Sequence, residues 1–377
     1  MNPMKHIRIT ILAAAFATAL SSLSLPAAET VKADDSRLVY VGRTLRQEGK
    51  VSFDWSAVYV RIRFQGNSLS TRVSDSRKNY YNVWIDRPMS EEPDKIISTF
   101  GKDSLIDIFS PSEIKARFGK KPLVHDVVIM KRTEGEQGKT TFASFSTDGD
   151  FLQAEGLKDR LIEFVGDSYT CGYGSENSVA SDPFKPETEN SNKTYAACLA
   201  RYFGADFIDV AHSGMGIARN YADHVRNYYM PDRYLHTFDE DSTATWNARA
   251  EVFRPDITLI YLCTNDFSTR RQPSLGSFKA NYIRLLKSIK ENYGEDHPIL
   301  CIAGKNDYQM SEYVHAAVIE SGLKNVSWMA FSPEIYSRDE MGASAHPNYA
   351  AHIKKAYAIA PYIATMTGWQ MTSTPIR

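Results

Sequence analysis

The chain has few cysteines and no cysteine–histidine spacing typical of a zinc site. Among its 377 residues there are four cysteines, Cys171, Cys198, Cys263 and Cys301, all after residue 170. Cys263 and Cys301 lie in apolar runs and are interpreted as small buried side chains. Four cysteines allow three full pairings, so the disulfide state stays open. We expect neither a metal nor an organic cofactor.

An excess of charge of one sign is also missing. The chain has 44 basic and 45 acidic residues and a formal net charge of −1. No long basic run is present, which argues against a nucleic-acid partner. The apolar share, 43%, is ordinary for a globular protein.

Only the first residues form a long apolar run. Lys5, His6 and Arg8 precede an apolar stretch over residues 9–25, and Pro26-Ala27-Ala28 offers a small-residue cleavage site. This pattern predicts a signal peptide over residues 1–28, and an uncleaved membrane anchor is the alternative. Cleavage removes Lys5 and Arg8, which takes the net charge to −3. We therefore expect a secreted or periplasmic protein with no membrane span after cleavage.

The next segment, residues 35–157, has the alternation of β-strands. Val58, Val60, Ile62 and Phe64 alternate with polar residues, and Gly66-Asn67 then marks a turn. Further strands are predicted around residues 69–73, 81–86, 123–130 and 140–145. Short strands separated by polar turns predict an all-β jelly-roll sandwich.

The remaining segment, residues 158–377, alternates strands and helices. Strands are predicted at residues 161–165, 207–210, 257–263, 299–303 and 326–331, and helices at about 194–203, 278–293, 310–321 and 348–365. Such alternation predicts an α/β domain with a parallel sheet and right-handed crossovers.

Four residues at strand ends and before the last helix carry the candidate chemistry. Ser168 follows the first parallel strand in Gly166-Asp167-Ser168, Gly214 follows the second, and Asn265 follows the third. His346 precedes Pro347, which we place in the first turn of the last helix. The first three positions share the edge at which open α/β sheets bind their ligands.

These residue types suit attack on an ester. A serine hydroxyl needs a base, and His346 is the candidate that takes the proton of Ser168. The oxyanion then needs donors, for which we nominate the backbone N–H groups of Ser168 and Gly214 and the side-chain amide of Asn265. Each motif alone has a structural explanation as a turn or cap, and only their joint occurrence favours catalysis.

The four blocks Gly166-Asp167-Ser168, Gly214, Thr264-Asn265-Asp266 and His346-Pro347 resemble those of the SGNH (GDSL-type) hydrolases. The resemblance extends to carbohydrate esterase family 2, through segments that include Phe53-Asp54-Trp55, Tyr80-Tyr81-Asn82-Val83-Trp84-Ile85-Asp86 and Lys131-Arg132-Thr133-Glu134. It implies an N-terminal jelly roll joined to an SGNH domain. It also implies removal of O-acetyl groups from polysaccharides such as xylan and glucomannan.

The sequence departs from the SGNH pattern before the histidine. The usual acid three residues upstream is replaced by Ala343, and no carboxylate stands close in front of His346. The resemblance to this family implies a Ser168–His346 dyad in which a backbone carbonyl orients the imidazole. An acid from elsewhere is the alternative, and the nearest upstream candidates are Glu334, Asp339 and Glu340.

The resulting expectation is an exported serine esterase that acts on acetylated carbohydrate through an acetyl-enzyme. Acyl transfer to another sugar and deacetylation of wall glycan are alternatives within the enzyme class. A carbohydrate-binding protein with a decayed site is the alternative outside it. Neither the natural polysaccharide, the acetyl position nor the oligomeric state follows from the sequence.

Overall fold

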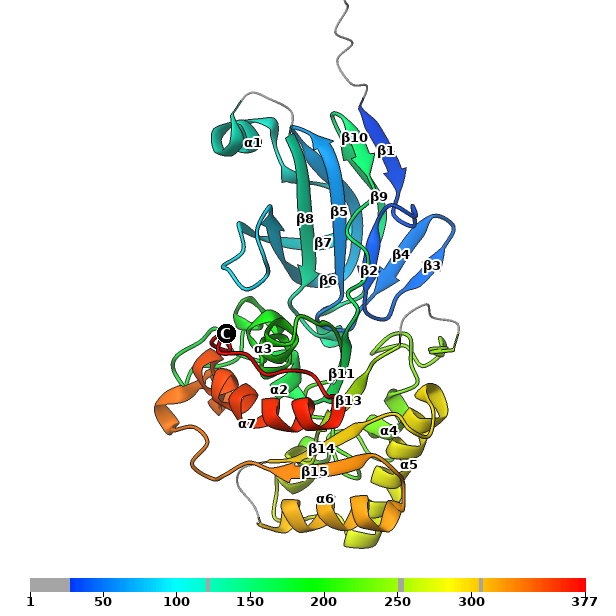
Figure 1. Cartoon of the computed structure of the whole chain (residues 1–377), viewed down its shortest axis with the longest axis vertical. Coiled ribbons are helices and arrows are strands. Elements are labelled where there is room, and N and C mark those ends of the chain that lie inside the picture. The colour runs from blue at the N-terminus through cyan, green and yellow to red at the C-terminus, as the bar shows by residue number, and fades with distance from the viewer. Residues whose placement is uncertain (1–27, 120–122, 250–253, 305–307) are drawn as a thin grey trace, which may run out of the picture.

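The computed structural model describes residues 28–119, 123–249, 254–304 and 308–377. The predicted signal peptide falls, up to residue 27, outside the described residues. Within those ranges no helix combines the length and the apolarity needed to cross a bilayer. The described chain forms an upper β-rich domain and a lower α/β domain, which meet along a broad interface (Figure 1).

The N-terminal domain is one curled antiparallel sheet in the path β10-β5-β8-β6-β9-β4-β3, with β1 on β9, β2 on β5 and β7 on β6. Its strands are β1 Glu29–Lys32, β2 Val39–Val41, β3 Leu45–Gln47, β4 Lys50–Phe53, β5 Tyr59–Gly66, β6 Leu69–Ile85, β7 Lys95–Phe109, β8 Leu123–Lys131, β9 Thr140–Thr147 and β10 Asp150–Leu152. A short helix, α1 (Pro111–Phe118), follows β7. The β-rich architecture is confirmed, while the jelly-roll arrangement stays a prediction.

Two features of this domain differ from the sequence-based expectation. The separate strands expected around residues 69–73 and 81–86 are one strand, β6, which pairs with β9 through its first half and with β8 through its last residues. Strand β7 was not expected at all. It pairs with β6 across irregular steps of register and exposes Phe100 and Leu105, so its sequence lacks the apolar alternation of a buried strand.

The C-terminal domain has the expected parallel sheet. Its strands β11 Leu161–Gly166, β12 Asp206–Ala211, β13 Ile257–Tyr261, β14 Ile299–Ala303 and β15 Val326–Ala330 stand in the order β12-β11-β13-β14-β15. Helices α3 Tyr195–Tyr202 and α7 Tyr349–Thr367 pack together on one face, and α5 Leu275–Tyr293 and α6 Tyr308–Ser321 on the other (Figure 1). The strand order reverses between β11 and β13, which is where doubly wound sheets place their sites.

Short elements complete the C-terminal domain. They are α2 Ser168–Cys171, α4 Met230–Arg233, the two-residue pair β16 Met341–Gly342 and β17 His346–Pro347, and 3-10 turns that include η4 Tyr221–Asp223, η5 Asn265–Phe267, η6 Arg338–Glu340 and η7 Ala343–Ala345, while the 3-10 turn η1 Gly135–Gln137 belongs to the β-domain, between β8 and β9. All four cysteines lie in described segments, where each is buried and none forms a disulfide.

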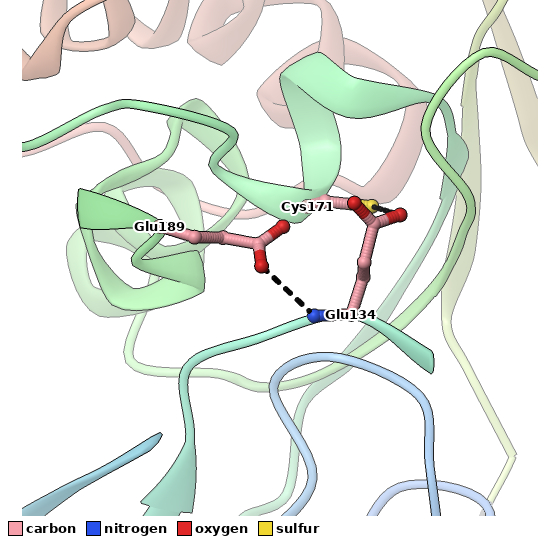
Figure 2. Close-up of side chains that lie close together, drawn as sticks. All are labelled: Glu134, Cys171 and Glu189. Atoms are coloured by element: carbon pink, nitrogen blue, oxygen red, sulfur yellow. Dashed lines mark hydrogen bonds between the residues drawn. The ribbon is translucent and has the colours of Figure 1, made fainter. Parts of the chain in front are cut away.

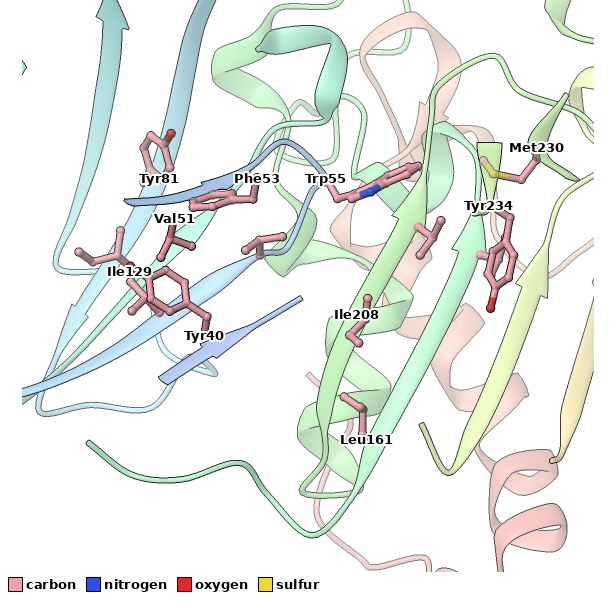
Figure 3. Close-up of a cluster of buried hydrophobic side chains, with 14 of the residues drawn as sticks. Tyr40, Val51, Phe53, Trp55, Tyr81, Ile129, Leu161, Ile208, Met230 and Tyr234 are labelled. Atoms are coloured by element: carbon pink, nitrogen blue, oxygen red, sulfur yellow. The ribbon is translucent and has the colours of Figure 1, made fainter. Parts of the chain in front are cut away.

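The two domains share a continuous apolar core. Figure 3 shows side chains of the β-domain, such as Phe53, and of the α/β domain, such as Ile208 and Tyr234, with Trp55 between the two groups. Trp55 is fully buried, and its indole N–H donates to Thr237 O at 3.0 Å. The α/β domain is thus packed against the β-domain rather than tethered to it.

Buried polar contacts also cross this interface. The guanidinium of Arg43 lies 3.2 Å from the carboxylate of Glu163, and both side chains are at most 1% exposed. Arg61 forms a second ion pair with Asp206, which also accepts a hydrogen bond from the Tyr59 hydroxyl at 2.7 Å. Because a buried charge without its partner is costly, these pairs fix how the domains dock.

Candidate active site

Ser168 is placed by the tight connection from β11 to α2. A side chain on Gly166 would overlap the Thr170 hydroxyl, so the turn requires glycine there. Asp167 caps α2 by accepting the Tyr169 N–H at 3.0 Å. Ser168 is therefore the first residue of the helix, where backbone N–H groups have no acceptor within the helix.

His346 lies against Ser168 in space, although the two residues are 178 positions apart in the sequence. Its Nε2 is 2.9 Å from Ser168 Oγ, and its Nδ1 is 3.0 Å from the carbonyl oxygen of Ser344. Ser344 and Ala345 have left-handed φ values of 51° and 57°, a costly backbone conformation for residues with a Cβ. This tight turn folds the Ser344 carbonyl back under the imidazole.

The start of α7 differs slightly from the expectation. Asn348 caps the helix with its side chain, so Pro347 precedes the first turn instead of lying within it. Pro347 and His346 form β17, which pairs with Met341 and Gly342. His346 is therefore held by a β-bridge as well as by its place just before the helix.

The imidazole of His346 is half-buried in the wall of the cleft. Its pKa is lowered to about 4, mainly by burial and also by the charge of Lys355, while the hydrogen bond to the Ser344 carbonyl partly opposes this shift. Tyr173 packs on the ring, with centroids 4.4 Å apart. At neutral pH the ring is neutral, and Nε2 can accept a proton.

Gly214 and Asn265 reach the same cleft as Ser168 and His346. Gly214 has φ = +79°, which glycine adopts without strain. The Asn265 amide nitrogen lies 2.8 Å from Met215 O and 3.2 Å from Asp167 Oδ2, so its N–H groups already face protein acceptors. To donate to a substrate oxygen, Asn265 would have to give up the longer contact.

Within the described residues, none of the three candidate acids forms a hydrogen bond or ion pair with His346. The carboxylate of Glu340 accepts from Lys354 Nζ and from Ser337 N–H, at 2.7 and 2.8 Å. Glu334 and Asp339 are exposed. Among the described residues, the recorded partner of His346 Nδ1 is the backbone oxygen of Ser344.

The cleft has a volume of about 460 Å³. Besides the four predicted residues, its walls include Glu136, Tyr173, His212, Tyr221 and His224. None of these five residues was among the predicted site residues. Glu136 comes from η1 of the β-domain, so both domains shape the cleft.

In the part of the chain that the structure describes, two clusters contain enough acidic and Cys or His side chains to be considered for a metal. In one, Arg233 donates to both Asp239 and Glu240 beside His212, so a cation already occupies that position. The other consists of Glu134, Cys171 and Glu189, which are all buried (Figure 2). Neither cluster contributes to the Ser168–His346 contact.

Comparison with known proteins identifies the family of the chain. Residues 164–357 match the model of the GDSL-like lipase/acylhydrolase family, which is more than half of the chain. The chain belongs to that family. Residues 40–154 match the carbohydrate esterase 2 N-terminal model, so the chain has the two-domain arrangement of carbohydrate esterase family 2.

Similar proteins have this arrangement too. The chain is 29% identical to cellulase/esterase CelE of Acetivibrio thermocellus over 90% of its length but spans only 41% of that protein. It is 28% identical to an acetylxylan esterase/glucomannan deacetylase of Cellvibrio japonicus, covering 87% of this chain and 90% of the relative. A family two carbohydrate esterase from Clostridium thermocellum, solved with cellohexaose, superposes with a TM-score of 0.78 at 28% identity, covering 88% of this chain and all of that structure.

Proposed function

We propose that this family member is an exported carbohydrate O-acetyl esterase that uses a Ser168–His346 dyad. The observation that carries the proposal is the 2.9 Å contact between His346 Nε2 and Ser168 Oγ in an open cleft. A neutral imidazole at that distance can take the hydroxyl proton as the oxygen attacks.

The proposed reaction has two steps. Ser168 Oγ bonds to the acetyl carbonyl carbon while His346 takes its proton, and the sugar oxygen leaves with that proton, giving an acetyl-enzyme. Water then attacks the acetyl carbon, His346 relays its proton back to Ser168, and acetate leaves. The N–H groups of Ser168 and Gly214 and the Asn265 amide are the proposed donors to each oxyanion.

We propose that the Ser344 carbonyl takes the place of the acid that usually orients the histidine. By accepting from Nδ1–H at 3.0 Å, it selects the tautomer in which Nε2 is free to act as base. A neutral carbonyl stabilises the imidazolium less than a carboxylate would. It keeps the ring orientation, which is a separate requirement.

The names of the relatives support the substrate class. Two relatives are named cellulase/esterase and acetylxylan esterase/glucomannan deacetylase. Both names indicate esters of plant polysaccharides as substrates. We extend this to acetylated xylan or glucomannan for the present chain. We also propose export after removal of residues 1–28, a jelly-roll domain over residues 35–157 and a catalytic domain over residues 158–377.

The test is acetate release from acetylated xylan, acetylated glucomannan and an aryl acetate, without added metal or cofactor. Ser168→Ala and His346→Ala should each lose at least about 1000-fold in kcat. Ser175→Ala removes a buried serine outside the cleft and serves as the matched control. Equal turnover by wild type and Ser168→Ala would reject the esterase and favour a binding protein.

Acyl transfer stays as the second candidate, because the same acetyl-enzyme can react with a sugar hydroxyl. Adding an unacetylated acceptor oligosaccharide separates the two outcomes. A hydrolase releases acetate regardless of acceptor, whereas a transferase yields newly acetylated oligosaccharide.

A further inference from the structure

A segment of the β-domain reaches beneath the catalytic loops. Between the end of β8 and η1, Glu134 extends from the β-domain toward α2 of the α/β domain, where Cys171 lies (Figure 2). Its side chain is fully buried. Burying a carboxyl group is costly unless hydrogen bonds compensate for the lost water, so the partners of Glu134 indicate which segments it holds in place.

Both partners of Glu134 Oε2 belong to segments next to the proposed catalytic groups. This oxygen accepts the backbone N–H of Ser213 at 2.7 Å, and Ser213 directly precedes Gly214. It also lies 3.5 Å from the thiol sulfur of Cys171, at the end of the short helix that begins at Ser168. Burial and the nearby Glu134 carboxyl raise the pKa of Cys171, so the thiol keeps its proton and can donate it.

Glu134 itself is firmly anchored. Its carbonyl oxygen accepts from Lys131 Nζ at 2.9 Å, and its N–H donates to Glu189 Oε2 at 3.3 Å. The next residue, Gly135, packs so closely on Asp239 that a Cβ would overlap that carboxylate. Burial raises the pKa of Glu189, which favours its protonated, uncharged form beside Glu134.

Few atoms pack against Gly214, which lies in a turn closed by the Met215 N–H donating to His212 O at 3.2 Å. A Cβ at this position would meet a single neighbour, Tyr221 Cβ at 3.5 Å. On the C-terminal side, Gly214 O accepts the Tyr221 N–H at 2.8 Å. On the N-terminal side, the nearest backbone anchor is the Ser213 N–H bond to Glu134.

We propose that Glu134 is a positioning residue, supplied by the β-domain, that fixes the direction of the Gly214 N–H for the oxyanion. This rests on the proposed esterase function. Glu134 does not touch substrate and acts through Ser213. The β-domain is therefore a structural part of the oxyanion hole, in addition to any contact it makes with carbohydrate.

The test compares two substitutions at one position. Glu134→Leu keeps the size of the side chain and removes the acceptor, so kcat should fall at least about 100-fold with KM within about threefold. Glu134→Gln keeps an oxygen that can accept from Ser213 and should stay within about tenfold of wild type. If Glu134→Leu does not fold, Glu134→Asp, which withdraws the acceptor by one methylene, should show the same kcat loss.

A matched control separates positioning from domain attachment. Arg43→Met breaks another buried contact across the same interface, away from the cleft, and should lower stability while leaving kcat within about threefold. Equal kcat losses in Glu134→Gln and Glu134→Leu, or a loss in Arg43→Met as large as that in Glu134→Leu, would overturn the proposal.

A second measurement does not depend on activity. Hydrogen exchange of a peptide covering residues 212–216 should be at least about tenfold faster in Glu134→Leu than in wild type, and near wild type in Glu134→Gln. Unchanged exchange would overturn the positioning role even in an active enzyme. An inactive wild type with the expected exchange pattern would instead reject the esterase function alone.

Discussion

Removing the side-chain acids upstream of His346 is the most direct test of how its imidazole is oriented. The substitutions are Glu334→Gln, Asp339→Asn and Glu340→Gln, each of which removes one negative charge at almost constant size. Because Ser344 O stands at 3.0 Å from Nδ1, we expect each variant to keep kcat within about threefold of wild type.

The magnitude follows from the contacts. A carboxylate that truly oriented the histidine would cost about 10⁴-fold in kcat when converted to its amide. The Glu340 carboxylate is engaged by Lys354 at the surface, so its loss should cost at most about 1 kcal/mol of stability. The two hypotheses therefore differ by more than three orders of magnitude in rate.

The assay is steady-state hydrolysis of an aryl acetate, with thermal unfolding measured on the same samples. His346→Ala supplies the lower limit of activity. A 1000-fold loss of kcat in any one amide variant, with an unchanged melting temperature, would refute the dyad and identify the third member of a triad.

Four further predictions concern pH, the oxyanion and the domain interface. The pKa of His346 is about 4 in the folded protein, below the ordinary 6.5, so the neutral base persists as pH falls. The acid limb of kcat/KM should therefore have its midpoint near pH 4, and a midpoint between 6 and 7 would contradict this. Because of the same shift, the unfolded chain binds a proton at His346 more readily than the folded protein does. The contribution of His346 to stability is therefore present above pH 6.5 and declines as pH falls toward 4. Urea unfolding at several pH values, with His346→Gln as the reference, measures this decline. Asn265→Ala should lower kcat about 100- to 1000-fold with little change in KM, and a loss below tenfold would remove Asn265 from the oxyanion hole. Arg43→Met should cost about 3–5 kcal/mol in urea unfolding, because it leaves the buried carboxylate of Glu163 without its cation, and a loss below about 1 kcal/mol would contradict this.

The parallel sheet was predictable because its strands are short, continuous apolar runs between helices of clear periodicity. The strands β11 to β15 lie within a few residues of their predicted positions. The β-domain was harder, because Ser74 to Asn79 is a polar run that looks like a turn yet continues β6. Its hydrogen bonds to neighbouring strands, which the sequence does not show, keep it extended.

The central residues of the site could be predicted from the sequence for a similar reason. Ser168, Gly214 and Asn265 follow parallel strands, and parallel strands bring their ends together, so the prediction placed them in one cleft. The contact of Ser344 O with His346 depends on two left-handed residues, which alanine and serine do not signal. Glu134 lies 79 positions from Ser213 in another domain, and no local pattern announces such a contact.

The apolar core around Trp55 has a practical consequence for anyone who shortens this chain. Two family models divide the sequence near residue 160, which invites expression of the second half alone. That fragment would present to water the apolar side chains that pack beneath Trp55, and it would leave Glu163 and Asp206 without their arginines. The boundary between the two family models is therefore a poor place to truncate the chain.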